Sequence, residues 1–118
     1  MMGNLSRETI NGKIFLVGEI NARKCSNLKK LLLELAETFN VPEYFYVNLN
    51  ALDEGMYDLS WHQEKNYKII VRKFNTLTDQ KQKNMITEEL NFYKTHWDEK
   101  RISEKDNEEN HFIVEYTE

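Results

Sequence analysis

Residues 42–64 read PEYFYVNLNALDEGMYDLSWHQE and contain no Lys or Arg. This segment predicts a helix from about Asn48 to Leu59, because Asn48 is a typical N-cap residue and apolar residues follow at helical spacing. At about 100° per residue, one side of the helix carries Leu49, Leu52, Met56 and Leu59. The other side carries Asn50, Glu54, Tyr57 and Asp58, with Asp53 near the boundary. One face should therefore pack, and the other should be presented to a partner.

The same segment holds practically all of the excess negative charge of the chain. The whole sequence has 20 acidic and 16 basic residues, a net charge of −4. Five acids lie within residues 42–64, which leaves 15 acids against 16 bases elsewhere. Five aromatic residues lie among these acids: Tyr44, Phe45, Tyr46, Tyr57 and Trp61. Acids beside rings suit a cationic protein partner, whereas direct binding of nucleic acid requires Lys and Arg.

Upstream of this segment the sequence predicts one strand and one helix. The compact apolar run at residues 14–17, bounded by Gly12 and Gly18, predicts a short buried strand within residues 10–20. A helix should follow with Ser26 or Asn27 as its N-cap, and it should end near Asn40 because Pro42 disfavours helical geometry just before it. Its core-facing stripe is Leu28, Leu31, Leu32, Leu35 and Phe39. A short helical turn is expected at residues 43–46.

Downstream, a strand is expected at residues 67–74 and another at residues 112–116. Between them, Thr78 or Asp79 should cap a helix that runs to about Trp97. Residues 98–110 are polar and predict a solvated helix end and loop. The acidic run at 106–110 is either a flexible solubilising loop or a second acidic stripe that adds to the negative field. Strands separated by helices imply crossover connections. The expected fold is therefore α/β, with a small three-stranded parallel sheet flanked by helices in one domain, residues 1–118.

Composition sets limits on the class of protein. The single cysteine, Cys25, predicts a small core residue and no internal disulfide. The first ten residues lack the apolar region of a signal peptide, and no apolar run approaches a membrane span, so a cytoplasmic location is expected. The three histidines have no metal-ligand spacing, and no glycine-rich phosphate loop or nucleophile motif is present. We expect neither an enzyme nor a cofactor.

The segment NLNALDEGMYDLSW at residues 48–61 resembles the signature of the barstar family. Six positions carry the resemblance: Asn48, Ala51, Leu52, Asp58, Leu59 and Trp61. The Pro-Glu-Tyr at residues 42–44 also matches, and the likeness is strongest over residues 10–75. The resemblance implies a barstar-like fold and the function of a stoichiometric inhibitor, an immunity protein that blocks the active site of a cationic ribonuclease toxin with an acidic helix. It would be a bacterial protein, monomeric before it binds.

The presented face departs from the family pattern, whereas the packing positions follow it. Asn50 stands where the family has its first helix aspartate, and Glu54 stands for the second. Asp53 replaces an aromatic residue, and Tyr46 replaces a glycine. This contrast indicates the same scaffold directed at a different partner. The resemblance and the charge pattern together give the expected partner-binding residues: Tyr44, Tyr46, Asn48, Asn50, Asp53, Glu54, Tyr57, Asp58 and Trp61.

Other interpretations of these residues stay open at this point. Acids on a helix face are often only a solvated surface, Trp61 can be a core ring that closes the helix end, and Asn48 can be purely a cap. The chain could instead be a non-inhibitory binding or regulatory module for a basic partner protein. A third possibility is an enzyme that uses Glu54 and Asp58 with a divalent ion.

Overall fold

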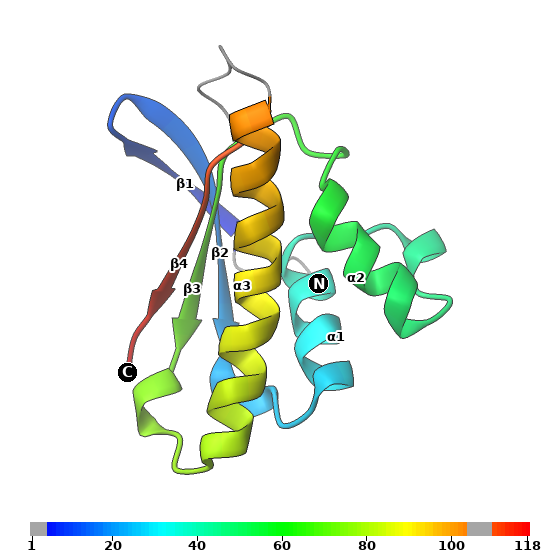
Figure 1. The fold of residues 1–118 in the computed structure, drawn as a ribbon, viewed down its shortest axis with the longest axis vertical. Helices are drawn as coiled ribbons and strands as arrows, with labels where there is room; N and C mark the ends of the chain where they lie inside the picture. Colours follow the sequence, from blue (N-terminus) through cyan, green and yellow to red (C-terminus); the bar gives the residue numbers. More distant parts are fainter. Residues whose placement is uncertain (1–4, 104–109) are drawn as a thin grey trace.

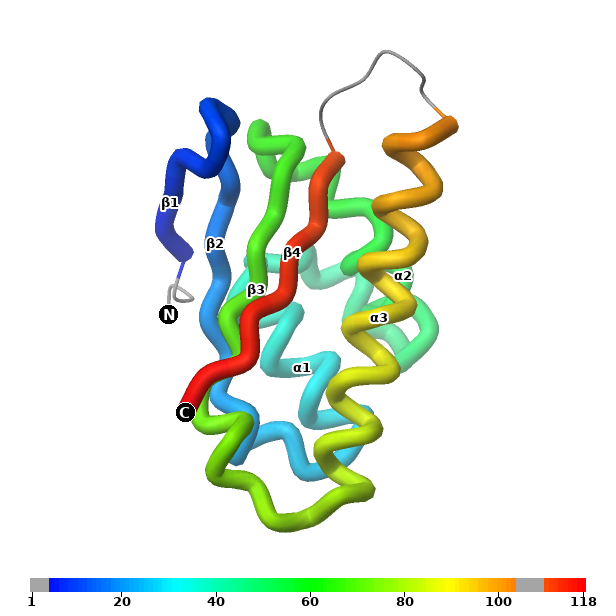
Figure 2. Tube along the Cα trace, turned by 60° about the vertical axis from the view of Figure 1, so that its left-hand side comes forward, coloured from blue at the N-terminus to red at the C-terminus, as the bar shows by residue number. Residues whose placement is uncertain are grey.

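The computed structural model describes residues 5–103 and 110–118, and its centre is a four-stranded sheet. The strands lie side by side in chain order (Figure 2): β1 (Leu5–Ile10), β2 (Lys13–Asn21), β3 (Tyr67–Arg72) and β4 (Phe112–Tyr116). Strands β2, β3 and β4 are parallel, and β1 is antiparallel to β2. The α/β class expected from the sequence is confirmed.

The three parallel strands expected from the sequence are present, but the sheet has a fourth strand, because β1 adds an antiparallel edge. Strands β1 and β2 form a hairpin whose two turn residues, Asn11 and Gly12, have φ values of 51° and 80°. An Asn-Gly pair accepts such angles at little cost and favours a tight hairpin. Strand β2 does not end at Gly18, as expected, but continues through it to Asn21.

Three helices cover one face of this sheet (Figure 1): α1 (Leu28–Thr38), α2 (Leu49–Asp58) and α3 (Gln80–Ser103). Short 3-10 turns precede α1, α2 and α3: η1 (Ala22–Lys24), η2 (Glu43–Phe45) and η3 (Phe74–Thr76). The main packing partners of α2 are α1 and α3 rather than the sheet. Helix α2 therefore forms the outer part of the helical layer, with one side free.

Side-chain caps set the starts of the helices. Of the two candidates before α1, Asn27 is the cap, and its Oδ1 accepts the backbone N–H of Lys30 at 2.9 Å. Asn48 caps α2 in the same way, through the N–H of Ala51 at 2.8 Å. Asp79 receives the N–H of Lys81 at 2.9 Å at the start of α3. Each cap satisfies backbone donors that the first turn of a helix leaves unpaired.

Two element ends differ from the expectation. Helix α3 continues past Trp97 to Ser103, where Asp98 forms ion pairs with Lys94 at 3.0 Å and Arg101 at 2.9 Å. These pairs lie three and four residues apart, the spacing that supports a helix. Strand β3 ends at Arg72, one residue before a left-handed Lys73. Of the acidic run at 106–110, residues 106–109 lie outside the described residues, and Asn110 is buried.

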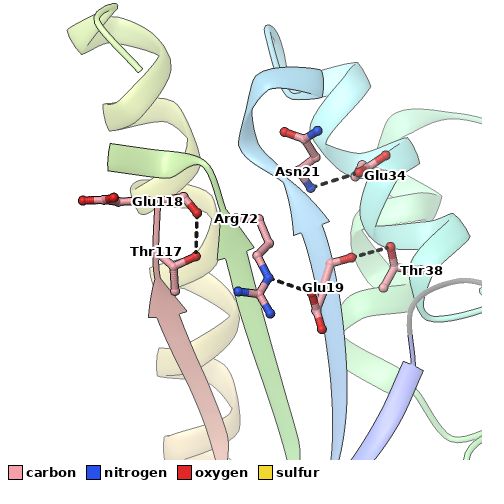
Figure 3. A network of polar contacts seen from close by, with 7 residues as sticks. All are labelled: Glu19, Asn21, Glu34, Thr38, Arg72, Thr117 and Glu118. Atoms are coloured by element: carbon pink, nitrogen blue, oxygen red, sulfur yellow. Dashed lines mark hydrogen bonds and ion pairs between the residues drawn. The ribbon is translucent and has the colours of Figure 1, made fainter. Parts of the chain in front are cut away.

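Polar contacts bind α1 to the carboxyl end of β2 (Figure 3). The Thr38 hydroxyl donates to the Glu19 carbonyl oxygen at 3.4 Å, and the Asn21 N–H donates to the Glu34 carboxylate at 3.1 Å. The Glu19 carboxylate in turn pairs with Arg72 of β3 at 2.7 Å. The carboxylates of Glu19 and Glu34 are thus used within the fold.

Candidate functional site

Helix α2 is held in place by contacts on its inner side. The Trp97 indole N–H of α3 donates to the Met56 carbonyl oxygen at 3.2 Å. Gly55 faces the Val41 side chain so closely that an added Cβ would lie 3.1 Å from it. At the end of the helix, Leu59 is fully buried in a left-handed conformation, with φ 52°, and its N–H donates to Gly55 at 3.0 Å. The outer side of α2 therefore projects from a rigid support.

The outer side of α2 carries acids that pair with no base of the described residues. Asn48, Asn50, Glu54 and Asp58 are all exposed. Within residues 5–103 and 110–118, no Lys or Arg forms an ion pair with Glu54, Asp58 or Glu43. Asp58 accepts only a local hydrogen bond from Ser60 at 3.0 Å. The charge on this face is therefore available to a cationic surface.

Two tyrosines border the acidic face at η2. Tyr44 is 70% exposed and Tyr46 is 41% exposed. The centroid of the Tyr44 ring lies 4.6 Å from that of Phe45, and the Phe45 centroid lies 5.7 Å from that of Trp61. Burial, and then the carboxylates of Glu37 and Glu43, raise the pKa of Tyr46. The phenol of Tyr46 thus lies in the negative field of neighbouring acids, and it is a large, stiff contact surface.

Two apolar residues that were not expected at the site extend this surface. Val47 is 74% exposed and Leu49 is 38% exposed. Leu49 was expected on the packing side, but the buried stripe of α2 begins only at Leu52. Leu28, the first residue of α1, is likewise 40% exposed. One feature of the sequence indicates that Val47 is exposed. It precedes the cap Asn48, so the apolar stripe of the helix assigns it no packing position.

Trp61 is tied to the end of α1. Its indole N–H donates to the Phe39 carbonyl oxygen at 3.0 Å, and Nε2 of His62 lies 2.6 Å from the same oxygen. The ring is half-buried and packs against the core through Phe45. This geometry favours the interpretation of Trp61 as a structural ring that closes a helix end, here the end of α1. A contact with a partner through its exposed edge stays a prediction.

Asp53 and Tyr57 are turned towards α3. The Asp53 carboxylate accepts the Tyr93 hydroxyl at 2.6 Å, and the Tyr57 ring meets the rings of Tyr93 and His96 edge-on, at 5.0 and 4.7 Å. Burial, Asp53 and Glu89 raise the pKa of Tyr57. The structure therefore brings Glu54, Asp58, Tyr44 and Tyr46 to the free surface, while Asp53 is shared with α3. Glu89, its neighbour there, was not expected from the sequence.

A family model described as Barstar (barnase inhibitor) matches residues 15–113. The chain belongs to the barstar family. The match begins inside β2, includes β3 and all three helices, and ends at the second residue of β4. No curated protein and no solved structure matches the chain. Barstar-family proteins are inhibitors that bind a ribonuclease, so at the level of the family this chain groups with binding proteins rather than with enzymes.

Two properties of the described residues concern membranes and metals. Across the described ranges, no helix combines the length and the apolar character that crossing a membrane requires. In the same ranges, no three His, Cys, Asp or Glu side chains gather in a way that could hold a metal ion. The candidate site is defined by exposure on η2, on α2 and between them: Tyr44, Tyr46, Val47, Asn48, Leu49, Asn50, Glu54 and Asp58.

Proposed function

We propose that this barstar-family chain is a stoichiometric protein inhibitor that blocks the active site of a cationic ribonuclease with the outer face of α2. One observation carries the proposal: Glu54 is an exposed carboxylate on a rigidly packed helix, and no base of the described chain pairs with it. The family to which the chain belongs is described by its inhibition of barnase.

The chemistry of a ribonuclease active site gives Glu54 its role. Such a site holds a phosphate and stabilises its developing negative charge with cationic and hydrogen-bonding groups. A carboxylate that enters this site occupies the position of the phosphate and meets the same donors. Asp58 lies one helical turn further on and adds to the field that attracts the nuclease. The inhibitor undergoes no reaction and uses no cofactor.

The apolar border of the acidic face supplies contact area around the charge. Exposed tyrosines and aliphatic side chains at an interface exclude water from the central charged contact, which strengthens it. Tyr44, Tyr46, Val47 and Leu49 are exposed on η2 and at the start of α2, and they would supply this contact area. The interface would have the usual size for an inhibitor complex, on the order of 1,600 Å² in total. Asn50 carries no charge, so the cognate nuclease would present fewer basic groups at that point.

In the cell, such an inhibitor would act as an immunity protein. A bacterium that makes a ribonuclease toxin, or meets one from its kin, needs an inhibitor in the cytoplasm where its own RNA lies. The chain would be monomeric until it binds, and it would contact the nuclease rather than RNA. The rival function is a regulatory module that holds a basic protein through the same face without blocking any activity, which the lost charge at Asn50 favours.

The experiment is a titration of RNA cleavage by purified barnase and by a panel of cationic barnase-type ribonucleases. We expect complete inhibition of at least one enzyme at one molar equivalent, and a large loss of inhibition for Glu54→Ala. Glu115→Gln is the matched control, because Glu115 pairs with Lys68 on the sheet side away from the helices at little energetic value. Binding without inhibition would support the regulatory module. No binding to any enzyme of the panel would contradict the proposal.

A further inference from the structure

A hydroxyl group of α3 holds the side chain of Asp53 on α2. The Tyr93 hydroxyl donates to the Asp53 carboxylate at 2.6 Å, a short distance that is typical of a hydrogen bond to a charged acceptor. Tyr93 is fully buried, and its ring packs against Phe112 of β4 with 6.3 Å between the ring centroids. The donor is therefore fixed by the core of the molecule.

Asp53 lies at the boundary between the two sides of α2. The buried stripe of the helix contains Leu52 and Met56, whereas Glu54, the residue after Asp53, is exposed. Asp53 itself is half-buried. A side chain at such a boundary can reach either side, because the staggered rotamers of an aspartate point its carboxylate in different directions. The hydrogen bond to Tyr93 selects a rotamer that points towards α3.

The Tyr93 hydroxyl compensates for the partial burial of the Asp53 carboxylate. Within residues 5–103 and 110–118, no Lys or Arg forms an ion pair with Asp53. A carboxylate that is partly removed from water costs free energy unless it is hydrogen-bonded or paired. Loss of the Tyr93 hydroxyl would therefore favour a rotamer that turns the Asp53 carboxylate out to water, beside Glu54.

A second hydrogen bond from α3 holds the backbone of α2. The Trp97 indole N–H donates to the Met56 carbonyl oxygen at 3.2 Å. Trp97 is buried, and its ring stacks on that of Phe112 with 6.2 Å between the centroids. Because this contact does not involve Asp53, removal of the Tyr93 hydroxyl should release the Asp53 side chain and leave the helix in place.

We propose that Tyr93 is a positioning residue that withholds the charge of Asp53 from the presented face of α2. The face then offers a partner one central carboxylate, that of Glu54, in place of two adjacent ones. A cationic site that matches a single carboxylate is in this way distinguished from a site with bases for two. The hydrogen bond itself requires no nuclease, whereas its consequence for binding rests on the proposed function.

The first test observes the Tyr93 hydroxyl proton by NMR in the free, full-length protein. We expect a separate resonance that exchanges slowly with water and shows a through-space contact to the Asp53 side chain. In Asp53→Ala the exchange should become about tenfold faster or more, the factor that corresponds to a lost hydrogen bond to a charged group. A wild-type hydroxyl proton in fast exchange with water, or without a contact to Asp53, would overturn the inference.

The second test is a double-mutant cycle of Asp53→Asn and Tyr93→Phe. It is measured as the dissociation rate from a barnase-type ribonuclease that the chain inhibits. Asparagine keeps an acceptor for the Tyr93 hydroxyl and removes the charge. We expect Asp53→Asn to leave the rate within about twofold in the wild-type background. In the Tyr93→Phe background it should raise the rate about fivefold or more, because there the freed carboxylate contacts the basic surface of the enzyme.

This cycle separates positioning from a structural role of the hydroxyl, which would not make dissociation depend on the charge of Asp53. Tyr116→Phe is the matched control background, because Tyr116 of β4 packs on Phe74 of η3 and not on α2. Equal effects of Asp53→Asn in the wild-type and Tyr93→Phe backgrounds would overturn the inference and leave the proposed inhibition standing. A wild-type chain that binds no ribonuclease of the panel would contradict the proposed function and, with it, the role of Tyr93 in binding.

Discussion

Glu54 is the residue on which binding should depend most. It stands where the barstar-family pattern has an aspartate, it is exposed, and the described chain offers it no base. We predict that Glu54→Ala weakens binding to the cognate ribonuclease by about 2–5 kcal/mol, the general range for losing one partner of a desolvated charge pair. Glu54→Gln should cost nearly as much, because the amide keeps the shape but not the charge. Isothermal titration calorimetry measures both.

The binding free energies of the two Glu54 variants can also contradict this role. If either variant binds within about 0.5 kcal/mol of the wild-type chain, then Glu54 is only a solvated surface acid. Asp58→Asn serves as a comparison within the same face. Because Asp58 is the last residue of α2 and already accepts a hydrogen bond from Ser60, its loss should slow association more than it speeds dissociation.

A substitution of Trp61 distinguishes a role in stability from a role in binding. Its indole N–H donates to the Phe39 carbonyl at 3.0 Å, so Trp61→Phe removes one hydrogen bond and part of a packed ring. We predict a loss of about 1 kcal/mol in the free energy of unfolding, measured with urea, and little change in affinity for the nuclease. A large loss of affinity with unchanged stability would instead place Trp61 at the interface.

Among the elements, the helices were the easiest to predict from the sequence. The Leu stripe of α1 and the residues Leu52 and Met56 of α2 follow the 3.6-residue period, and asparagines cap both helices. Strand β1 was missed because it is a mostly exposed edge strand with only weak apolar character. Its one local signal was the Asn-Gly turn that follows it.

The directions of the site side chains could be predicted only where they depend on α2 alone. The helical period gives the angle at which Glu54 and Asp58 leave α2, and both are exposed as expected. The helical period does not indicate which helix packs beside α2. It therefore could not predict that Asp53 faces Tyr93 and Glu89 of α3. The exposure of Leu49 depends in the same way on how far α1 and α3 reach along α2.

Gly18 sets how closely α1 can approach β2. A Cβ at this position would lie 2.6 Å from the ring of Phe39, which is fully buried and cannot easily move. We predict that Gly18→Ala lowers the free energy of unfolding by about 1–3 kcal/mol, the usual cost of overpacking a core. Thermal or urea unfolding measures this change. An alanine that leaves stability unchanged would mean that α1 shifts on the sheet without cost.

The pairing of acids with bases differs between the sheet and the segment of η2 and α2. On the sheet, acids are paired with bases: Glu8 and Glu115 with Lys68, Glu19 with Arg72, and Glu64 with Arg7. Although burial acts in the other direction, the hydrogen bond and charge of Arg7 lower the pKa of Glu64. On α2 and η2 the acids stay unpaired in the described chain. The segment 42–64, which contains η2 and α2, holds five acids and no Lys or Arg.

This charge distribution predicts how binding depends on salt. Association with a cationic ribonuclease should slow strongly as ionic strength rises, because screening shortens the reach of the field from about 10 Å at 0.1 M salt to about 3 Å at 1 M. Dissociation should change little, since contacts at the interface are short. Stopped-flow kinetics at several salt concentrations separates the two rates. An association rate that is independent of salt would contradict steering by α2.

A double-mutant cycle tests the central claim most directly, that Glu54 occupies the phosphate position of a ribonuclease active site. The cycle pairs Glu54→Ala with alanine at a basic active-site residue of the inhibited enzyme, and binding energies are measured for all four combinations. Our account predicts a coupling of about 1.5 kcal/mol or more, as expected for close interfacial charges. Additive effects, within about 0.5 kcal/mol, at every basic residue of that active site would contradict it.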